Sequence, residues 1–139
     1  MESIAAPAPS KLPPIIQTFT IRAPDYAYAH LELVSTSSPA SSCPSAPDAL
    51  QVRSLLSHAL SRFLGAVGNA VHPDILRVTA DGHAWVRVPR DDLPVLTAAL
   101  AFWSGERDGA ADVTLRVRRA GNWLGCLVGQ DAEEEKLWG

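Results

Sequence analysis

The sequence has little cysteine and no long apolar run. Only Cys43 and Cys126 occur among 139 residues, which is too few for a disulfide framework or a zinc site with paired cysteine ligands. No apolar stretch approaches the roughly 20 residues needed to cross a membrane. The first residues also lack the basic and apolar regions of a secretory signal. We therefore expect an intracellular protein from a reducing compartment, with no membrane partner.

An excess of positive charge is also missing. Lys and Arg number 12 against 15 Asp and Glu, which gives a net charge of -3. The segment Asp131–Gly139 holds four acids and one lysine and accounts for this imbalance. The rest of the chain is neutral, so any basic surface must come from the placement of the arginines. Net charge therefore neither supports nor excludes a nucleic-acid partner.

Patterns that would indicate catalysis or a cofactor are scarce. The four histidines do not have the spacing of metal ligands, and no Ser or Cys lies in a recognisable nucleophile motif. Gly121, Gly125 and Gly129 lack the Lys-Ser/Thr of a nucleotide-binding loop. The sequence thus predicts no catalytic residue, no metal site and no cofactor.

Three segments have the composition of flexible chain. Residues 1–16 are rich in Ala and Pro and are predicted to form a disordered leader. Residues 35–47 form a Ser/Pro-rich loop, and residues 131–139 form an acidic tail. Residues 17–130 are predicted to be a single domain into which that loop is inserted.

The spacing of apolar residues predicts six elements of secondary structure. Alternation indicates strands, whereas helices are indicated by apolar residues three and four apart behind a capping aspartate. In chain order, we expect a strand at Tyr26–Val34, a helix from Asp48 to Gly65, strands at Asp74–Thr79 and His83–Val88, a helix capped by Asp91 or Asp92, and a strand at Val113–Arg119. This order predicts an α+β fold, a ferredoxin-like or RRM-like βαββαβ two-layer sandwich with an antiparallel sheet.

Both helices of such a fold cover the same face of the sheet, and the first and third strands are central. Alternation then assigns every strand residue to one face. The residues predicted to face the helices are Ala27, Ala29, Leu31, Leu33, Leu76, Val78, Ala84, Val86, Val88, Val113, Leu115 and Val117. Those predicted to face outward are Tyr26, Tyr28, His30, Arg77, His83, Trp85, Arg87, Arg116 and Arg118.

The outward set has two interpretations, which remain open at this level. Aromatic rings beside arginines suit base stacking and phosphate binding, yet the same residue types dominate the centres of protein interfaces. The stretch DGHAWVRV matches an RNA-recognition strand only in part. The RNA-binding candidates are Arg77, Arg87, Arg116, Arg118, Arg119, Gly121 and Asn122. The stacking or protein-interface candidates are Tyr26, Tyr28, His30, His83 and Trp85.

Several stretches together are similar to one known family. YAYAHLELV, LQVRSLLSHALSRFLGAVGNAVHPDILRV, HAWVRVPRDDL and GNWLG occur in that order over about Tyr26–Gly129. The chain resembles the fungal eighth Pop protein, a small subunit of nuclear ribonuclease P and ribonuclease MRP. The related fifth Pop subunit has Ser-Gly-Thr after its last strand, where this chain has Ala120-Gly121-Asn122.

The resemblance implies a noncatalytic subunit of ribonucleoproteins that process tRNA and rRNA, in which the RNA performs the chemistry. It implies pairing with the fifth Pop subunit in a heterodimer, assembly with the Rpp-one protein and other subunits, and contact with the ribonuclease P and MRP RNAs. It also implies a location in the nucleus and nucleolus. The alternative is a stand-alone protein-binding module that dimerises through its open sheet face and binds no RNA.

Overall fold

The computed structural model describes residues 12–35, 46–108 and 111–129. Its elements in chain order are β1 (Tyr26–Ser35), α1 (Ala49–Leu64), β2 (Asp74–Val78), β3 (His83–Pro89), α2 (Leu93–Phe102), β4 (Glu106–Asp108) and β5 (Ala111–Gly121). Short 3-10 helices at Gly65–Ala70 and Arg90–Asp92 follow α1 and precede α2, and a last helix spans residues 124–129. The six predicted elements are all present. The strand β4 and the last helix were not predicted.

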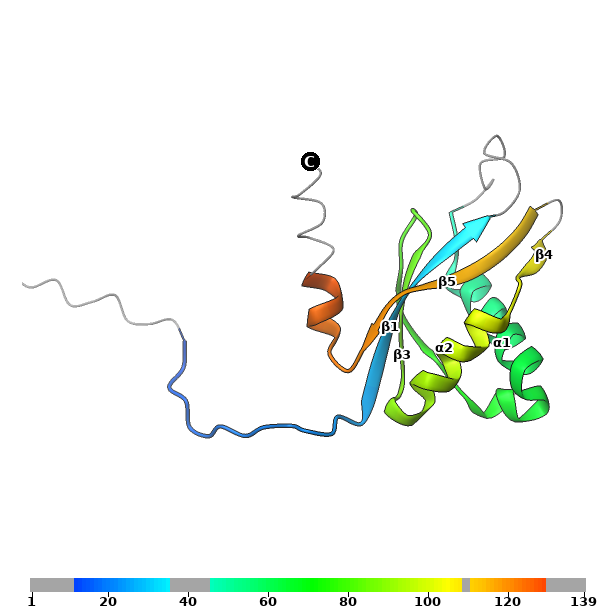
Figure 1. Ribbon diagram of the computed structural model, residues 1–139. Coiled ribbons are helices and arrows are strands. Elements are labelled where there is room, and N and C mark those ends of the chain that lie inside the picture. The colour runs from blue at the N-terminus through cyan, green and yellow to red at the C-terminus, as the bar shows by residue number, and fades with distance from the viewer. Residues whose placement is uncertain (1–11, 36–45, 109–110, 130–139) are drawn as a thin grey trace, which may run out of the picture.

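The strands form one antiparallel sheet in the order β2-β3-β1-β5-β4. The predicted ferredoxin-like order is confirmed, with β1 at the centre and β4 added beyond β5 at one edge. Helices α1 and α2 lie together on one side of the sheet (Figure 1). Among the described residues, no helix is long and apolar enough to cross a membrane.

Local signals in the sequence explain where these elements begin and turn. The Asp48 carboxylate accepts a 2.7 Å hydrogen bond from the backbone N–H of Ala49 and so caps α1. Gly65 ends the helix with a φ of 67°, and Gly82 has a φ of 89° in the β2–β3 hairpin, a conformation that glycine adopts without strain. Asp92 occupies the N-cap position of α2, as predicted, but its side chain makes no capping hydrogen bond. The proline in the first turn is also present as predicted.

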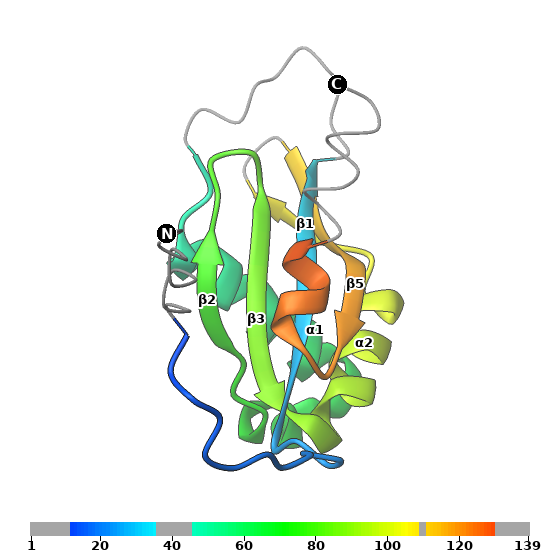
Figure 2. The same ribbon diagram turned by 90° about the vertical axis from the view of Figure 1, so that its left-hand side faces the viewer.

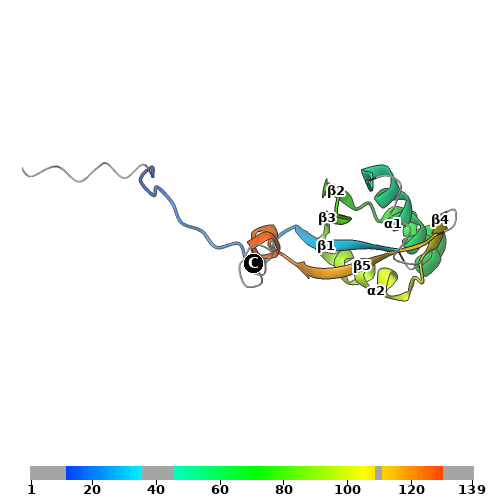
Figure 3. The same cartoon turned by 90° about the horizontal axis from the view of Figure 1, so that it is seen from above.

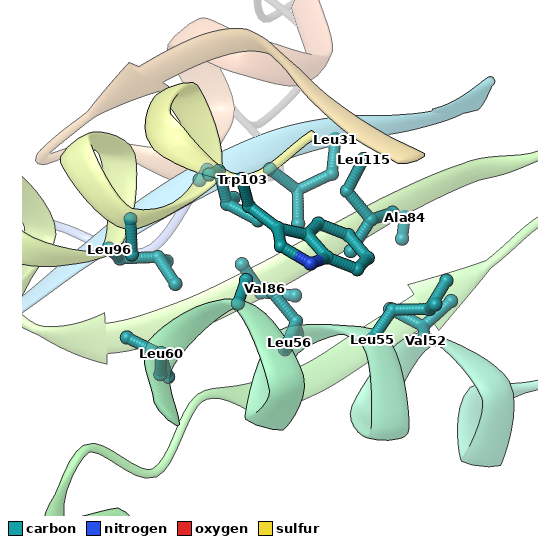
Figure 4. Packing of buried hydrophobic residues seen from close by; sticks show 14 of the residues in the cluster. Leu31, Val52, Leu55, Leu56, Leu60, Ala84, Val86, Leu96, Trp103 and Leu115 are labelled. Carbon is teal, nitrogen blue, oxygen red and sulfur yellow. The ribbon is translucent and has the colours of Figure 1, made fainter. Parts of the chain in front are cut away.

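The core lies between the sheet and the two helices. Leu31 and Val86 from the sheet are fully buried against Leu56 and Leu60 of α1 and Leu96 of α2, and Trp103 reaches into the space between the layers (Figure 4). Every fully buried large side chain is aliphatic, as expected for a close-packed interior. The helix spacing read from the sequence therefore identified the residues that hold α1 and α2 on the sheet.

One inward assignment is wrong. Leu76 is 42% exposed, and Ile75 packs against the core instead. The cause is an irregularity in β2, where Ile75 pairs with Val86 but Arg77 already pairs with Trp85. A bulge of this kind adds one residue to a strand and shifts the alternation that follows it. Because Leu76 is the extra residue, Arg77 and Val78 after it lie on the faces predicted for them.

Parts of the predicted flexible segments lie outside the described residues. These are residues 1–11 of the leader, 36–45 of the Ser/Pro loop and the whole acidic tail at 131–139. The end of the leader, residues 12–16, belongs to an extended stretch with no helix or strand before β1. Ser35, assigned to the loop, is the last residue of β1.

Candidate binding face of the sheet

The face of the sheet turned away from α1 and α2 is called the outer face here. Its side chains meet in rows, because antiparallel pairing brings residues of like orientation side by side. The register places Arg77 of β2 beside Trp85 of β3, Trp85 beside His30 of β1, and His30 beside Arg119 of β5. This central row has two aromatic groups in the middle and an arginine at each end. The predicted proximity of the first and third strands' aromatic residues is confirmed here.

The middle of the central row is a compact ring cluster. His30 and Trp85 stack with centroids 4.5 Å apart and planes within 6°, and His30 Nε2 lies 3.1 Å from Nδ1 of His83. His30 is only 4% exposed. The rings that were candidates for stacking on a ligand are therefore stacked on each other, and His30 in particular presents almost no free surface.

Trp85 retains one unused polar group. Its indole N–H is buried and has no hydrogen-bond partner among the described residues, although an indole N–H usually finds an acceptor when it is buried. The remainder of the residue is half-buried. Of the aromatic residues in the central row, Trp85 is thus the one that still offers exposed surface.

A second cluster joins β3 to both neighbouring strands. Arg87 donates to Asp74 of β2, with Nη2 2.8 Å from Oδ2, and its guanidinium lies 4.5 Å from the centre of the Tyr26 ring. The hydrogen bond with Asp74 raises the pKa of Arg87. Tyr28 lies directly beside Arg87 in the register. Arg87 is therefore already matched with a carboxylate and an aromatic ring.

The arginines of β5 are arranged by a second bulge. His30 pairs with Arg119 but Leu31 pairs with Val117, so Arg118 is the extra residue. Arg118 forms an ion pair with Glu32, with Nη1 3.2 Å from Oε2. Arg116 lies beside Glu32 in the register and is exposed. Strict alternation did not place Arg119 on the outer face, and only the bulge brings it beside His30.

Four of the five candidate arginines consequently differ in how their charge is used. Arg87 and Arg118 are held by carboxylates. Arg77 and Arg116 are exposed and make no ion pair within the part of the chain that the structure describes. Position in the sequence did not reveal this difference, because Asp74 and Glu32 reach these arginines only through strand pairing.

The outer face is not fully open, contrary to the sequence-based expectation. The helix at residues 124–129 lies in front of β1 when the sheet is viewed from its outer side (Figure 2), and Leu127 in that helix is 5% exposed. The spacing of Leu124, Leu127 and Val128 was the available signal for a short amphipathic helix. No element was predicted for this stretch, which follows the last predicted strand.

Two hollows border this helix. One of about 360 Å³ is lined by residues 119–123 together with Cys126 and Leu127, and so contains the candidates Arg119, Gly121 and Asn122. The other, of about 250 Å³, lies between Tyr26 and Tyr28 on one side and Trp123 and Leu124 on the other. Trp123 borders both hollows and is half-exposed, yet it was not among the predicted site residues. Gly121 has room for a side chain, so its backbone is not sterically required to be glycine.

Within the described residues, no group of three or more His, Cys, Asp or Glu side chains is arranged to hold a metal ion. The sheet order and the two helices on one side define the chain as a ferredoxin-like α+β sandwich. Aromatic rings and arginines line its outer face. Residues 25–103 match the family model described as the ribonucleases P/MRP protein subunit Pop8. The chain belongs to the Pop8 family.

A solved structure supports the same fold. The chain is similar to one in the cryo-EM structure of yeast ribonuclease MRP, with a TM-score of 0.64 and 21% identity over 86% of this chain and 96% of that one. No curated protein matches this chain in sequence. The resemblance noticed in the sequence is thus confirmed at the level of the family.

Proposed function

We propose that this chain is a noncatalytic subunit of both ribonuclease P and ribonuclease MRP, which braces their RNAs and pairs with neighbouring protein subunits during tRNA and rRNA processing. The observation on which this rests, beside family membership, is the central row. Arg77, Trp85, His30 and Arg119 cross four adjacent strands and put cationic groups at both ends of a ring cluster. Such a row suits a phosphate backbone lying across the sheet.

An accessory role is supported by the state of the histidines on this face. His30 and His83 are bonded to each other, and His30 is buried beneath its neighbours. A general acid or base must come within hydrogen-bond reach of the proton that it transfers. His30 has too little exposed surface to approach a phosphodiester, which leaves the chemistry to other components of the assembly.

The contact with RNA is assigned to the central row and to the exposed part of β5 beside it, so that Arg77 and Arg116 both lie along the RNA. Arg116 projects from the exposed part of that strand, and the hollow lined by Arg119, Gly121, Asn122 and Trp123 lies at its end. Arginine side chains there can bind phosphates while the Trp123 ring offers a stacking surface. Tyr26 and Tyr28, which line the other hollow beside Leu124, are assigned to protein contact.

The expected protein neighbours are the fifth Pop subunit, as the other half of a heterodimer, and the Rpp-one protein. The expected location is the nucleus and nucleolus. The stand-alone dimer remains an outcome that experiment can produce, although the helix at residues 124–129 already occupies part of the face that such a dimer would use.

The experiment is purification of the tagged full-length chain from its own cells, with sequencing of the RNA and identification of the proteins that accompany it. Recovery of the ribonuclease P and MRP RNAs with Pop proteins is expected. Partners that persist after nuclease treatment are held by protein contacts. A monodisperse homodimer without RNA would contradict the proposal.

The RNA surface has its own matched test. Exchanging Arg77 and Arg116 for Gln should weaken RNA binding and reduce the slope of log affinity against log salt by about two counterions, roughly one per lost phosphate contact. Exchanging Arg87 and Arg118, which carboxylates already hold, removes the same charge and should change the slope by less. Equal changes of the slope in the two variants would contradict the division of these arginines into those held by carboxylates and those available to bind phosphate.

A further inference from the structure

The chain before β1 is an extended apolar segment. Residues 12–24 have no helix or strand, and this segment runs away from the folded body (Figures 1 and 3). Its large side chains are exposed to solvent: the exposed fraction is 85% for Ile15, 95% for Ile16 and 74% for Phe19. Exposed apolar groups this close together commonly indicate a surface that another molecule covers. We call residues 15–22 the arm.

The composition of the arm is that of a β-strand. In the sequence IIQTFTIR, residues 15–22, six of eight residues are β-branched or aromatic, which are the types enriched in strands. One side of an extended chain would present Ile15, Gln17, Phe19 and Ile21, and the opposite side Ile16, Thr18 and Thr20. The first side is therefore the more apolar one. Pro13, Pro14 and Pro24 bound this stretch, as prolines commonly bound a strand.

The backbone of the arm also has no partner of its own. Between Pro13 and Pro24, no backbone hydrogen bond is formed with any residue that the structure describes. Ile21 lines the hollow at the root of the arm beside Tyr26 and Trp123, so the arm meets the folded body there. An apolar, alternating segment with unused N–H and C=O groups has what β-strand addition requires.

The sheet of this chain is a poor acceptor for the arm of a second copy. Its edge strands are β2 and β4. β2 is five residues long and contains the bulge at Leu76, and β4 has only three residues, all charged. Short, bulged and charged edges are those that resist pairing with another strand. The acceptor is therefore a different protein with a longer and regular open edge.

We propose that the arm adds as an outer strand to an open sheet edge of a neighbouring protein subunit, with Ile15, Phe19 and Ile21 packed against that subunit. The inference rests on the proposed function in one respect only, namely that the neighbouring subunit belongs to the ribonuclease P or MRP assembly.

The first test is hydrogen exchange, resolved to single amides, on the full-length chain alone and in the purified ribonucleoprotein. Strand addition predicts that alternate amides within residues 15–22 exchange at least tenfold more slowly in the assembly, because every second N–H of an edge strand is bonded to the acceptor. Exchange that is equally fast in the two samples would overturn the inference.

The second test compares Phe19→Asp with Thr18→Asp in pull-downs of the assembly proteins after nuclease treatment. Both variants add one negative charge at adjacent positions of a segment outside the core, so both should keep the melting temperature of the parent. We expect Phe19→Asp to reduce recovery at least tenfold and Thr18→Asp to reduce it by less than threefold. Equal losses would contradict packing of one side of the arm.

A proline pair tests the backbone contribution. Gln17→Pro and Thr18→Pro each remove one N–H, and neighbouring N–H groups of a strand point to opposite sides. Only one of the two should abolish recovery of the partner proteins, and full recovery with both would overturn strand addition. A parent chain that recovers neither RNA nor Pop proteins would instead overturn the proposed function and the inference with it. Slow exchange of the arm in a homodimer would overturn the choice of partner.

Discussion

The two faces of the sheet are built by the same strands and have opposite characters. On the inner face, Ala29, Leu31 and Val86 are completely buried among aliphatic side chains. On the outer face, the neighbouring His30 and Trp85 stack on each other. The inner face gains its stability from area removed from water, whereas the outer face satisfies its polar groups mainly through one another.

The comparison separates the residues that stabilise the fold from those available for binding. Inner-face substitutions should act on folding and leave the salt dependence of RNA binding unchanged. Outer-face substitutions should have smaller effects on folding and alter recognition. Four substitutions test this division, in order of decreasing effect on stability.

The largest effect is expected for Leu31→Ala. Leu31 is fully buried at the centre of the sheet between β3 and β5, and truncation of such a leucine leaves a cavity. The free energy of unfolding should fall by about 2–5 kcal/mol, measured by urea denaturation. A loss below about 1 kcal/mol would mean that the two layers are not closely packed at this position.

Trp85→Ala should come next. It removes the ring that stacks on His30, and we expect a loss of about 2 kcal/mol from burial and stacking together. Trp85→Phe is the matched control, since it keeps a ring and removes the buried N–H that lacks a partner. The control should be nearly neutral, because no hydrogen bond within the described chain is broken. A large loss for Phe would show that the N–H is bonded after all.

Leu127→Ala tests the covering of the outer face. A helix as short as residues 124–129 is not stable without packing, and Leu127 is its buried contact. Amides of this helix should exchange at least tenfold faster in the variant, whereas those of β1 should not change. Val128→Ala, at an exposed position of the same helix, serves as the control. Equal effects of the two changes would contradict the packing of the helix on the sheet.

Glu32→Gln should have the smallest effect on stability. The partly exposed ion pair with Arg118 contributes about 0.2–1 kcal/mol. The substitution also releases Arg118 for phosphate binding, so the slope of log affinity against log salt should become steeper by about one counterion. Tighter RNA binding with a nearly unchanged melting temperature is the expected result, and weaker binding would show that Glu32 itself supports the RNA contact.

Much of the inner face could be predicted from the sequence. Alternation in β1 and β3 depends only on local geometry, so Leu31 and Val86 were assigned correctly to the inner face. The assignment failed at Leu76 because a bulge breaks the period of two. No local residue pattern announced that bulge, since it depends on how β2 pairs with β3.

The candidate site was predictable in content but not in arrangement. Alternation placed Arg77, Trp85 and His30 on one face, and the register confirms that they meet. It did not reveal that Arg87 forms an ion pair with Asp74 and Arg118 one with Glu32. Nor did it reveal that residues 124–129 cover part of the outer face. These features join residues far apart in the chain, so only strand pairing and packing create them.

The sequence by itself determined the order of the six main elements and the apolar face of each helix. It also determined that one face of the sheet is apolar and the other aromatic and basic. Helical and strand periods are local properties of the backbone, so a local pattern is enough to predict them. Tertiary structure decided which arginines remain available, which rings are stacked on each other and how much of the outer face is open. Those outcomes depend on contacts between residues far apart in the chain, such as Glu32 and Arg118, which are 86 residues apart, and no local pattern encodes such contacts.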